Sequence, residues 1–165
     1  MNPSGSDLFV VKYSPDLSEL WTAQLESEEV ERGNAIVVAQ DCDGQTAAFV
    51  AGTTSTVLQP VLTAKCVDAE FQWVETFAPV GDEIAATANA ISISPNRSIF
   101  VAGSLDSAFY GFIASVSDTV DEDGNCLGEG EHLGTVIQMD ICDDPTGVDA
   151  TFGVSSRFDL SLIHI

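Results

Sequence analysis

Residues 49–52 read FVAG, and residues 100–103 read FVAG again, 51 positions later. A weaker copy, FGVS, stands at 152–155, a further 52 positions along the chain. The first two copies lie in short runs of β-branched and aromatic residues that are bounded by turn-forming residues. A motif that returns at a nearly constant offset indicates an internal repeat, and here the repeat has about fifty residues.

Two other landmarks return with a similar offset. Trp21 returns as Trp73, 52 positions later, and the tripeptide NAI at 34–36 returns at 89–91 after a slightly longer connection. Three independent landmarks therefore agree on the repeat. They divide the chain into repeats that cover approximately residues 6–56, 57–107 and 108–159.

Each repeat reads as short strands joined by tight turns. The turn-forming sequences SPD at 14–16, DCDG at 41–44 and SPNR at 94–97 separate runs rich in Val, Ile, Phe and Thr, although the last of these turns lacks a glycine. Such runs are typical of antiparallel strands and hairpins. The expected strands lie near residues 8–14, 19–25, 34–40, 46–54, 60–66, 71–77, 88–94, 98–104, 110–117, 134–141 and 149–156.

A four-stranded unit of this size cannot bury both of its faces alone, but units that stack radially can. We therefore expect an all-β fold of β-propeller blades, each blade being a four-stranded antiparallel meander. Closed propellers have about 4 to 8 blades, so three repeats would form an open arc. The sequence predicts a partial β-propeller over residues 1–159.

The chain is strongly acidic, which excludes two classes of partner. It has 5 Lys and Arg residues against 26 Asp and Glu residues, for a net charge of −21. The basic residues are scattered, whereas nucleic-acid binding needs a clustered basic surface. An anionic membrane surface would repel the chain, and no apolar run approaches the ~18 residues of a membrane span. We expect neither nucleic-acid binding nor membrane insertion.

The first repeat carries DLFVVKYSPD at 7–16, ELW at 19–21, GNAIVV at 33–38 and FVAGTTS at 49–55. Over residues 6–56 this pattern resembles one unit of the SBBP-type β-propeller repeats. The resemblance implies an extracellular or cell-surface protein in which the repeats act as a scaffold. It also implies that the remaining blades belong to the same parent chain, of which this sequence would be a fragment.

The third repeat departs most from the pattern, because an acidic, glycine-bearing segment at 118–131 replaces its expected second strand and turn. This segment gathers oxygen donors around a glycine turn, and oxygen is the ligand that Ca²⁺ prefers. Its spacing does not complete the twelve-residue loop that ends in a bidentate Glu, so a solvated acidic loop is the alternative. The candidate calcium ligands are Asp118, Asp121, Asp123 and Asn125.

Apart from calcium, no cofactor is expected. Trp21 and Trp73 are predicted to be buried aromatic residues between blades, because no paired cysteines, cofactor carboxylates or cation accompany them. The four cysteines contain no CxxC spacing, which argues against zinc, and their pairing is open. One disulfide, Cys66 with Cys126, is the expectation for a secreted protein, and free buried thiols are the alternative. The cysteines are Cys42, Cys66, Cys126 and Cys142.

No residue stands out as catalytic. His132 lies in a Gly- and Glu-rich segment that we expect to be a loop, and no nucleophile has a recognisable base. We expect a non-enzymatic module that is a structural scaffold or presents a binding surface to a protein or carbohydrate ligand. The alternative is a fragment of a propeller enzyme, of hydrolase, lyase or quinoprotein type, whose catalytic residues lie in other blades. A pocket lined by two close carboxylates or by a cation would favour that alternative.

The two ends of the chain carry features outside the repeats. Residues 1–7 have no signal-peptide pattern. The last residues, LSLIHI at 160–165, resemble a translated sequencing adapter. We expect this tail to be a product of DNA assembly.

Overall fold

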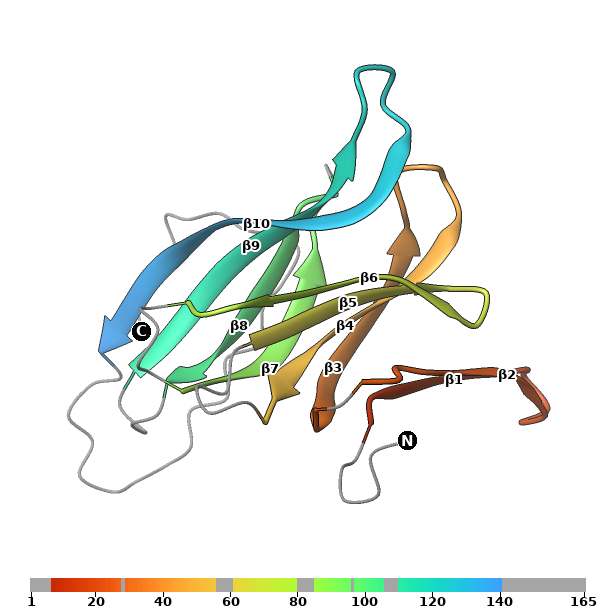
Figure 1. Cartoon of the computed structure of the whole chain (residues 1–165), viewed down its shortest axis with the longest axis horizontal. Helices are drawn as coiled ribbons and strands as arrows, with labels where there is room; N and C mark the ends of the chain where they lie inside the picture. Colours follow the sequence, from red (N-terminus) through yellow and green to blue (C-terminus); the bar gives the residue numbers. More distant parts are fainter. Residues whose placement is uncertain are drawn as a thin grey trace.

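The computed structural model describes residues 7–27, 29–55, 61–79, 85–95, 97–105 and 110–140. These residues form an all-β structure of ten strands with no helix, as expected from the sequence. The strands build one two-stranded hairpin and two four-stranded sheets (Figure 1). Within these residues no helix is long and apolar enough to cross a membrane.

Both four-stranded sheets are antiparallel meanders, in which strands that follow one another in the sequence are neighbours in the sheet. The amino-terminal hairpin consists of β1 (Phe9–Tyr13) and β2 (Glu19–Gln24). The central sheet consists of β3 (Glu31–Gln40), β4 (Thr46–Thr54), β5 (Val61–Val67) and β6 (Glu70–Phe77). The carboxyl-terminal sheet consists of β7 (Ala86–Ile93), β8 (Ile99–Leu105), β9 (Tyr110–Val120) and β10 (Cys126–Asp140).

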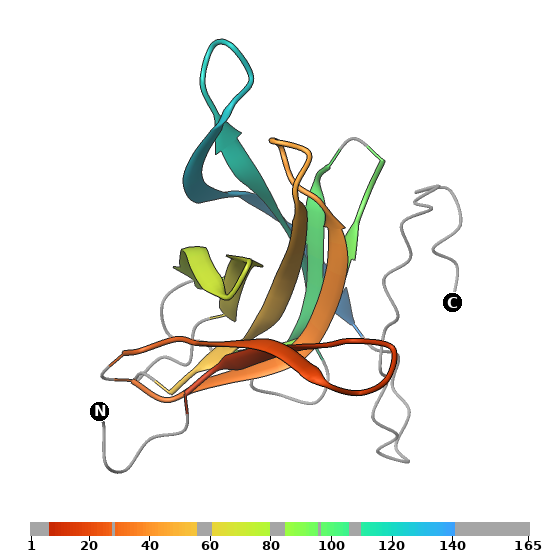
Figure 2. The ribbon, with the colours of Figure 1, turned by 90° about the vertical axis from the view of Figure 1, so that its right-hand side faces the viewer.

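The central sheet lies between the other two units (Figures 1 and 2). One of its faces packs on the carboxyl-terminal sheet in a core that includes Phe49, Val101 and Phe112. The other face packs on the hairpin in a second core that includes Val10 and Leu62. Burial of apolar area on both faces is the main favourable contribution to this stacking.

Strand β5 shows how the sequence serves both cores. Val61 and Val67 enter the core shared with the carboxyl-terminal sheet, whereas Leu62, Ala64 and Cys66 enter the core shared with the hairpin. Side chains alternate between the faces of a strand, so a strand that is covered on both sides is apolar at nearly every position. All seven residues of β5 are buried.

The repeated NAI sequence marks a β-bulge in each sheet. The register between β3 and β4 shifts between Gly33 and Ala35, and the register between β7 and β8 shifts between Ala88 and Ala90. The residue left over by each shift is an asparagine of the repeated motif. A bulge inserts one unpaired residue into a strand, so the repeated motif encodes the same local geometry twice.

The glycine that ends each FVAG sequence is required by the bulge opposite it. A Cβ atom at Gly52 would lie 1.8 Å from the carbonyl oxygen of Arg32, and one at Gly103 would lie 1.9 Å from the carbonyl oxygen of Thr87. Neither distance is possible between non-bonded atoms. The two landmarks of the repeat therefore describe one contact between neighbouring strands.

Four five-residue turns share one hydrogen-bond pattern: 14–18, 41–45, 94–98 and 121–125. In each, the first residue's N–H donates to the carbonyl of the fifth, and the fourth residue's N–H donates to the carbonyl of the first. The fourth residues, Leu17, Gly44, Arg97 and Gly124, have φ angles of 64°, 77°, 67° and 86°. Leu17 and Arg97 therefore adopt the left-handed conformation at a position that is glycine in the other two turns.

The prediction for segment 118–131 was wrong, because this segment is not a loop. It forms the end of β9, a tight turn and the start of β10, which pairs with β9. The missing second strand of the third repeat is therefore present, and His132 lies within it. The expected strand at 134–141 corresponds to the second half of β10, but the first half was missed because residues 126–133 are rich in Gly and Glu, which have weak strand propensity.

The other expected strands up to residue 120 correspond to β1–β9, with ends that differ by three residues or fewer. The expected strand at 149–156 and the tail at 160–165 lie outside the described residues. Each sheet spans parts of two repeats, since β3 and β4 come from 6–56 and β5 and β6 from 57–107. The described residues form no closed ring.

Candidate functional site

Two features of the described residues stand out. One is a polar group of side chains between the two four-stranded sheets, which we call the inter-sheet cluster: Asp41, Lys65, Trp73 and Asp118. The other is an open pocket between β1 and β3, which we call the β1–β3 pocket.

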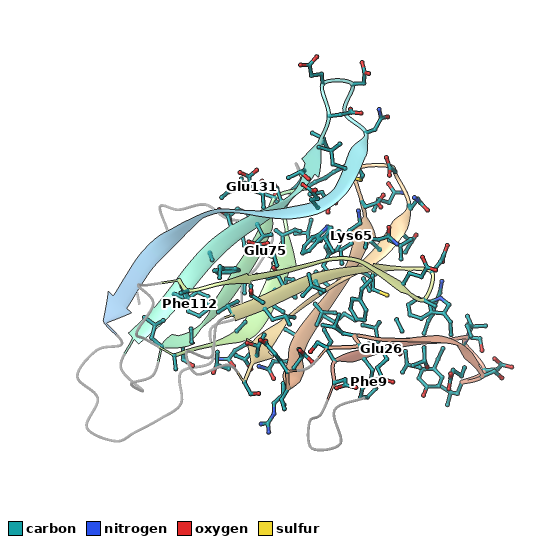
Figure 3. The ribbon with its side chains drawn as sticks, viewed as in Figure 1. Phe9, Glu26, Lys65, Glu75, Phe112 and Glu131 are labelled. Carbon is teal, nitrogen blue, oxygen red and sulfur yellow. A yellow bond between two sulfur atoms is a disulfide. The ribbon has the colours of Figure 1, made fainter. Side chains whose placement is uncertain are left out.

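Lys65 is the centre of the inter-sheet cluster (Figure 3). Only 3% of its side chain is exposed. Its Nζ atom lies 3.1 Å from Oδ2 of Asp41 and 3.3 Å from Oδ2 of Asp118. Asp41 begins the turn after β3, and Asp118 belongs to β9 of the other sheet. A buried ammonium is tolerated only when anions partner it, so this ion triad joins the two sheets.

Trp73 supports the same junction from β6. Its indole N–H donates to Oδ1 of Asp118 over 2.6 Å. A Cβ atom at Gly130 of β10 would lie 2.7 Å from Cε3 of the indole, so the ring packs directly on the backbone there. Trp73 is buried between the sheets, as predicted. The same prediction does not hold for Trp21, which is only half-buried and whose buried Nε1 has no hydrogen-bond partner among the described residues.

A disulfide between Cys42 and Cys126 links the β3–β4 turn to the start of β10, with a Cα–Cα distance of 5.5 Å. The N–H of Cys126 donates to the Asp43 carboxylate over 3.2 Å, and Arg97 donates to the carbonyl of Cys42 over 3.0 Å. The predicted pair of Cys66 with Cys126 was therefore wrong.

The alternation of β5 explains this error. Cys66 is a free thiol buried in the core shared with the hairpin, on the face of the central sheet opposite the disulfide. Burial raises the pKa of this thiol, with a smaller contribution in the same direction from the charge of Asp68. The sequence signal that could have excluded Cys66 is its place in the alternating series Leu62, Ala64 and Cys66. Cys142 lies outside the described residues.

The candidate calcium ligands have separate partners. Oδ1 of Asp121 accepts hydrogen bonds from the N–H groups of Asp123 and Asn125, and Oδ2 accepts one from the Asn125 amide at 2.9 Å. These bonds, led by that from the Asn125 side chain, lower the pKa of Asp121. Asp118 instead points into the inter-sheet cluster, toward Lys65. Calcium binding stays a prediction, which a calorimetric titration of the protein with CaCl₂ would test.

Two groups of possible metal ligands lie at the same junction: Cys42, Asp118 and Cys126, and Asp41, Asp43 and Cys126. Each group contains a cysteine of the disulfide, which offers no thiolate to a metal. The Lys65 ammonium already forms ion pairs with both Asp41 and Asp118. The chemistry of this junction is therefore that of a cross-link between sheets.

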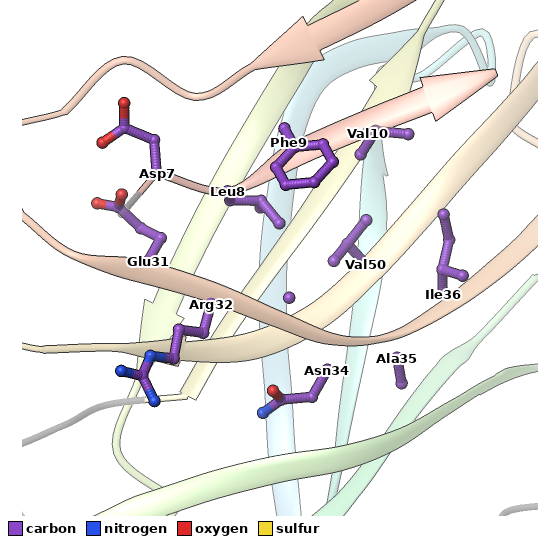
Figure 4. Close-up of a pocket in the computed structure, with 11 residues that line it drawn as sticks. Asp7, Leu8, Phe9, Val10, Glu31, Arg32, Asn34, Ala35, Ile36 and Val50 are labelled. Atoms are coloured by element: carbon purple, nitrogen blue, oxygen red, sulfur yellow. The ribbon is translucent and has the colours of Figure 1, made fainter. Parts of the chain in front are cut away.

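The β1–β3 pocket has a volume of about 520 Å³ (Figure 4). Asp7 and Glu31 form its acidic end, and Arg32 also lines it. Its apolar wall includes Phe9 and Ile36, from the two strands that border it.

The acidic end holds two buried acceptors without donors. Glu31 is only 3% exposed, and Ser27 donates to its Oε1, while Oε2 has no hydrogen-bond partner among the described residues. Gln24 donates to Oδ2 of Asp7 over 2.6 Å, while Oδ1 is equally unpartnered. Buried carboxylate oxygens without partners are costly, so this end of the pocket is suited to a cation or a strong hydrogen-bond donor.

Comparisons with known proteins give no assignment: no protein-family model matches the chain, and no curated protein matches it.

Proposed function

We propose that the chain is a non-enzymatic β-propeller repeat module that serves as a structural scaffold, or presents a binding surface, in a secreted or cell-surface protein. One observation carries the proposal. The four-stranded meander occurs twice, with the same bulge and the same obligatory glycine, and the two copies stack face to face. A fold that repeats one supersecondary unit is typical of scaffolds.

The hairpin supports the interpretation of each meander as a blade. Lys12 pairs with Trp21 across β1 and β2, as Lys65 pairs with Trp73 across β5 and β6. The hairpin is therefore equivalent to the last two strands of the central sheet. On this interpretation, the chain contains two blades and the outer half of another, and further blades of the same parent chain would extend the arc.

The disulfide supports the proposed location. Structural disulfides persist in oxidising compartments and are rare in the cytosol. Cys42 and Cys126 are 84 residues apart, so their bond constrains most of the described chain. The excess of carboxylates, 26 against 5 basic residues, suits a solvated exterior and a ligand without negative charge, such as a neutral carbohydrate or a protein with a basic surface.

The β1–β3 pocket favours the alternative in one respect, since two carboxylates and a cation line it. The alternative is a piece of a propeller enzyme of hydrolase, lyase or quinoprotein type. One observation argues against an enzyme: the two-stranded hairpin beside the pocket covers only part of the four-stranded central sheet. The pocket is therefore also a suitable place for further strands of the proposed blade.

The two functions predict different outcomes in one experiment. The whole chain, secreted from a host that forms disulfides, is immobilised and exposed to a panel of polysaccharides and basic proteins, and each solution is then analysed for products. A scaffold or binding module gives saturable binding and no product. Accumulation of cleaved or eliminated products that disappears in Asp7→Asn and Glu31→Gln variants would contradict the proposal.

A further inference from the structure

The two carboxylate oxygens of Asp41 have different partners. Oδ2 lies 3.1 Å from Nζ of Lys65. Oδ1 instead accepts hydrogen bonds from two backbone N–H groups, that of Asp43 at 3.0 Å and that of Gln45 at 2.7 Å. The carboxylate is therefore held between a lysine on one oxygen and two fixed donors on the other.

Two backbone N–H groups on one carboxyl oxygen are the arrangement of an oxyanion hole. Attack on a carboxyl carbon places negative charge on the oxygen that stays bonded, and donors already aimed at that oxygen stabilise the charge without reorganisation. Here the donors belong to the turn at 41–45, whose backbone is fixed by its own hydrogen bonds. Attack by Lys65 on Cγ of Asp41 would therefore be assisted at Oδ1.

Asp118 brings a second carboxylate to the same nitrogen. Its Oδ2 lies 3.3 Å from Nζ of Lys65, while its Oδ1 accepts the indole N–H of Trp73 over 2.6 Å. The indole fixes the orientation of this carboxylate and leaves Oδ2 directed at the lysine. A carboxylate within hydrogen-bond reach of a reacting amine can accept a proton and return it, as a general base and then a general acid.

The three reacting groups are shielded from water. The side chains of Lys65 and Asp41 are 3% and 2% exposed, and that of Asp118 is 12% exposed. Charges are costly in such a site, and conversion of one ion pair to a neutral amide removes two of the three charges. Exclusion of water also protects the amide from hydrolysis.

The turn at 121–125 shows what distinguishes Asp41. Asp121 has the same position in its turn, and its Oδ1 accepts the corresponding pair of backbone N–H groups. Its Oδ2, however, accepts the side-chain amide of Asn125 at 2.9 Å, and an amide nitrogen is not a nucleophile. The turn geometry alone is therefore structural, and the buried lysine is what gives Asp41 a reactive neighbour.

We propose that Lys65 and Asp41 condense to form an isopeptide bond between Nζ and Cγ, with Asp118 as the group that transfers the proton. The ion triad is the state from which this bond forms. The bond ties β5 to the turn that joins β3 and β4, next to the disulfide of Cys42. It is independent of the blade interpretation.

The condensation balances without an oxidant, a reductant or a co-reactant. One proton passes from the Lys65 ammonium to Oδ2 of Asp41, and the neutral amine that remains forms the bond from Nζ to Cγ. Asp118 takes a second proton from the nitrogen and passes it to Oδ2. The bond from Cγ to Oδ2 then breaks, and that oxygen leaves as water. The nitrogen keeps one hydrogen, and Asp118 is ionised again.

The surrounding donors and acceptors fit the amide as well as the ion pair. Oδ1 of Asp41, now a carbonyl oxygen, keeps its two backbone donors. The amide N–H is in place to donate to Oδ2 of Asp118, whose other oxygen keeps the indole of Trp73. The charge that remains buried therefore has two donors, as a buried carboxylate requires.

Mass spectrometry of the whole chain tests the bond, because condensation removes one water. The chain is secreted from a host that forms disulfides, and it is reduced and denatured before its mass is measured. The protein is expected to be lighter than its reduced sequence by one water. Trypsin is expected not to cleave after Lys65, because the amine is acylated.

Chymotryptic digestion locates the bond. Chymotrypsin cleaves after Phe49, which lies between the two residues in the sequence, so a peptide with Asp41 and a peptide with Lys65 stay joined. This readout separates the isopeptide from a succinimide at Asp43 and Gly44, which loses the same mass but joins no peptides.

Two variants each remove one reacting group and preserve its structural role. Lys65→Arg keeps a buried cation but has no nucleophilic amine. Asp41→Ser keeps the turn, because Ser14 and Ser94 begin the equivalent turns and their Oγ atoms accept the N–H of the fifth residue. Both variants are expected to have the full mass of their sequences.

A third variant tests the proton transfer. Asp118→Asn keeps an acceptor for Trp73 but removes the base. It is expected to slow bond formation by at least about 100-fold, followed as the fraction of protein that has lost water at intervals after synthesis. Asp121→Ser is the matched control, since it makes the same change in the equivalent turn, and it is expected to lose one water as the parent protein does.

A parent protein that has its disulfide between Cys42 and Cys126, but that keeps the full mass and is cleaved after Lys65, would overturn the proposal. Loss of water that persists in Lys65→Arg would also overturn it, because the water would then come from another site. Neither result affects the proposed scaffold function, whose failure is seen instead as product formation in the binding experiment.

Discussion

At the scale of single residues, Asp118 has the most consequential position. It accepts the indole N–H of Trp73 and contacts the ammonium of Lys65, and both of these residues belong to the other sheet. Sequence reasoning grouped Asp118 with the acidic turn that follows it, because proximity along the chain suggested a common ligand. The contacts that define its role join residues 45 and 53 positions apart, and no local pattern reports them.

The two tryptophans give a matched pair for the first prediction. Trp73→Phe removes a hydrogen bond to a carboxylate, whereas Trp21→Phe removes an N–H that has no partner among the described residues. Trp73 is also more buried than Trp21, so lost packing adds to the difference. Trp73→Phe is therefore expected to lower the free energy of unfolding by about 1–3 kcal/mol more than Trp21→Phe, as measured by urea denaturation. Equal losses would show that the bond to Asp118 contributes nothing to stability.

The two equivalent lysines give the second prediction. Lys65→Met leaves Asp41 and Asp118 without their buried cation, and is expected to cost about 3–5 kcal/mol in urea denaturation. Lys12→Met removes an exposed ammonium 5.8 Å from the Trp21 ring and is expected to cost no more than about 1 kcal/mol. A Lys65→Met protein as stable as Lys12→Met would contradict the ion triad.

At the scale of elements, the repeat explains why so much of the fold is readable from the sequence. Strands β1–β9 carry β-branched and aromatic residues between turn-forming residues, and three landmarks fix their order. The first half of β10, residues 126–133, lacks that composition, and its packing on Trp73 favours a glycine, Gly130, over an apolar side chain. The disulfide between Cys42 and Cys126 was also missed, because it joins two different sheets and the sequence pattern does not show how those sheets stack.

The bulge gives the third prediction. Gly52→Ala places a Cβ atom against the carbonyl oxygen of Arg32, and is expected to cost at least about 3 kcal/mol. Gly44→Ala is the control, because Gly44 has a φ of 77° but open space around it, so only backbone strain of about 1 kcal/mol is expected. Thermal unfolding of the two variants measures the difference. Similar melting temperatures would mean that β3 and β4 do not approach as described.

The turn at 121–125 gives the fourth prediction, which concerns pH. Hydrogen bonds from Asn125 and from the backbone lower the pKa of Asp121, so the ionised carboxylate stabilises the turn. This contribution is present above the ordinary aspartate pKa of about 3.9 and is lost as the pH falls through the lowered value. Hydrogen exchange followed by NMR should show the amide N–H groups of Asp123 and Asn125 losing protection in that acidic range. An Asp121→Ala variant should lack this transition, and an unchanged pH profile in that variant would contradict the assignment.

At the scale of the whole molecule, two four-stranded meanders are held together by an apolar core, an ion triad and a disulfide. The disulfide closes a long loop, so its loss in a Cys42→Ser/Cys126→Ser variant is expected to cost about 2–5 kcal/mol. The parts of this architecture that repeat were predictable from the spacing of motifs. The contacts between its sheets were not, because each is made once and joins residues with different positions in their repeats.

The stacking of the two meanders is the central claim, and mapping of the disulfides tests it most directly. The protein is digested under non-reducing conditions after alkylation, and its peptides are identified by mass spectrometry. The account predicts a linked pair of peptides containing Cys42 and Cys126, with Cys66 alkylated only after unfolding, because burial raises the pKa of its thiol. A link between Cys66 and Cys126 would contradict it, since these residues lie on opposite faces of the central sheet in the stacked structure.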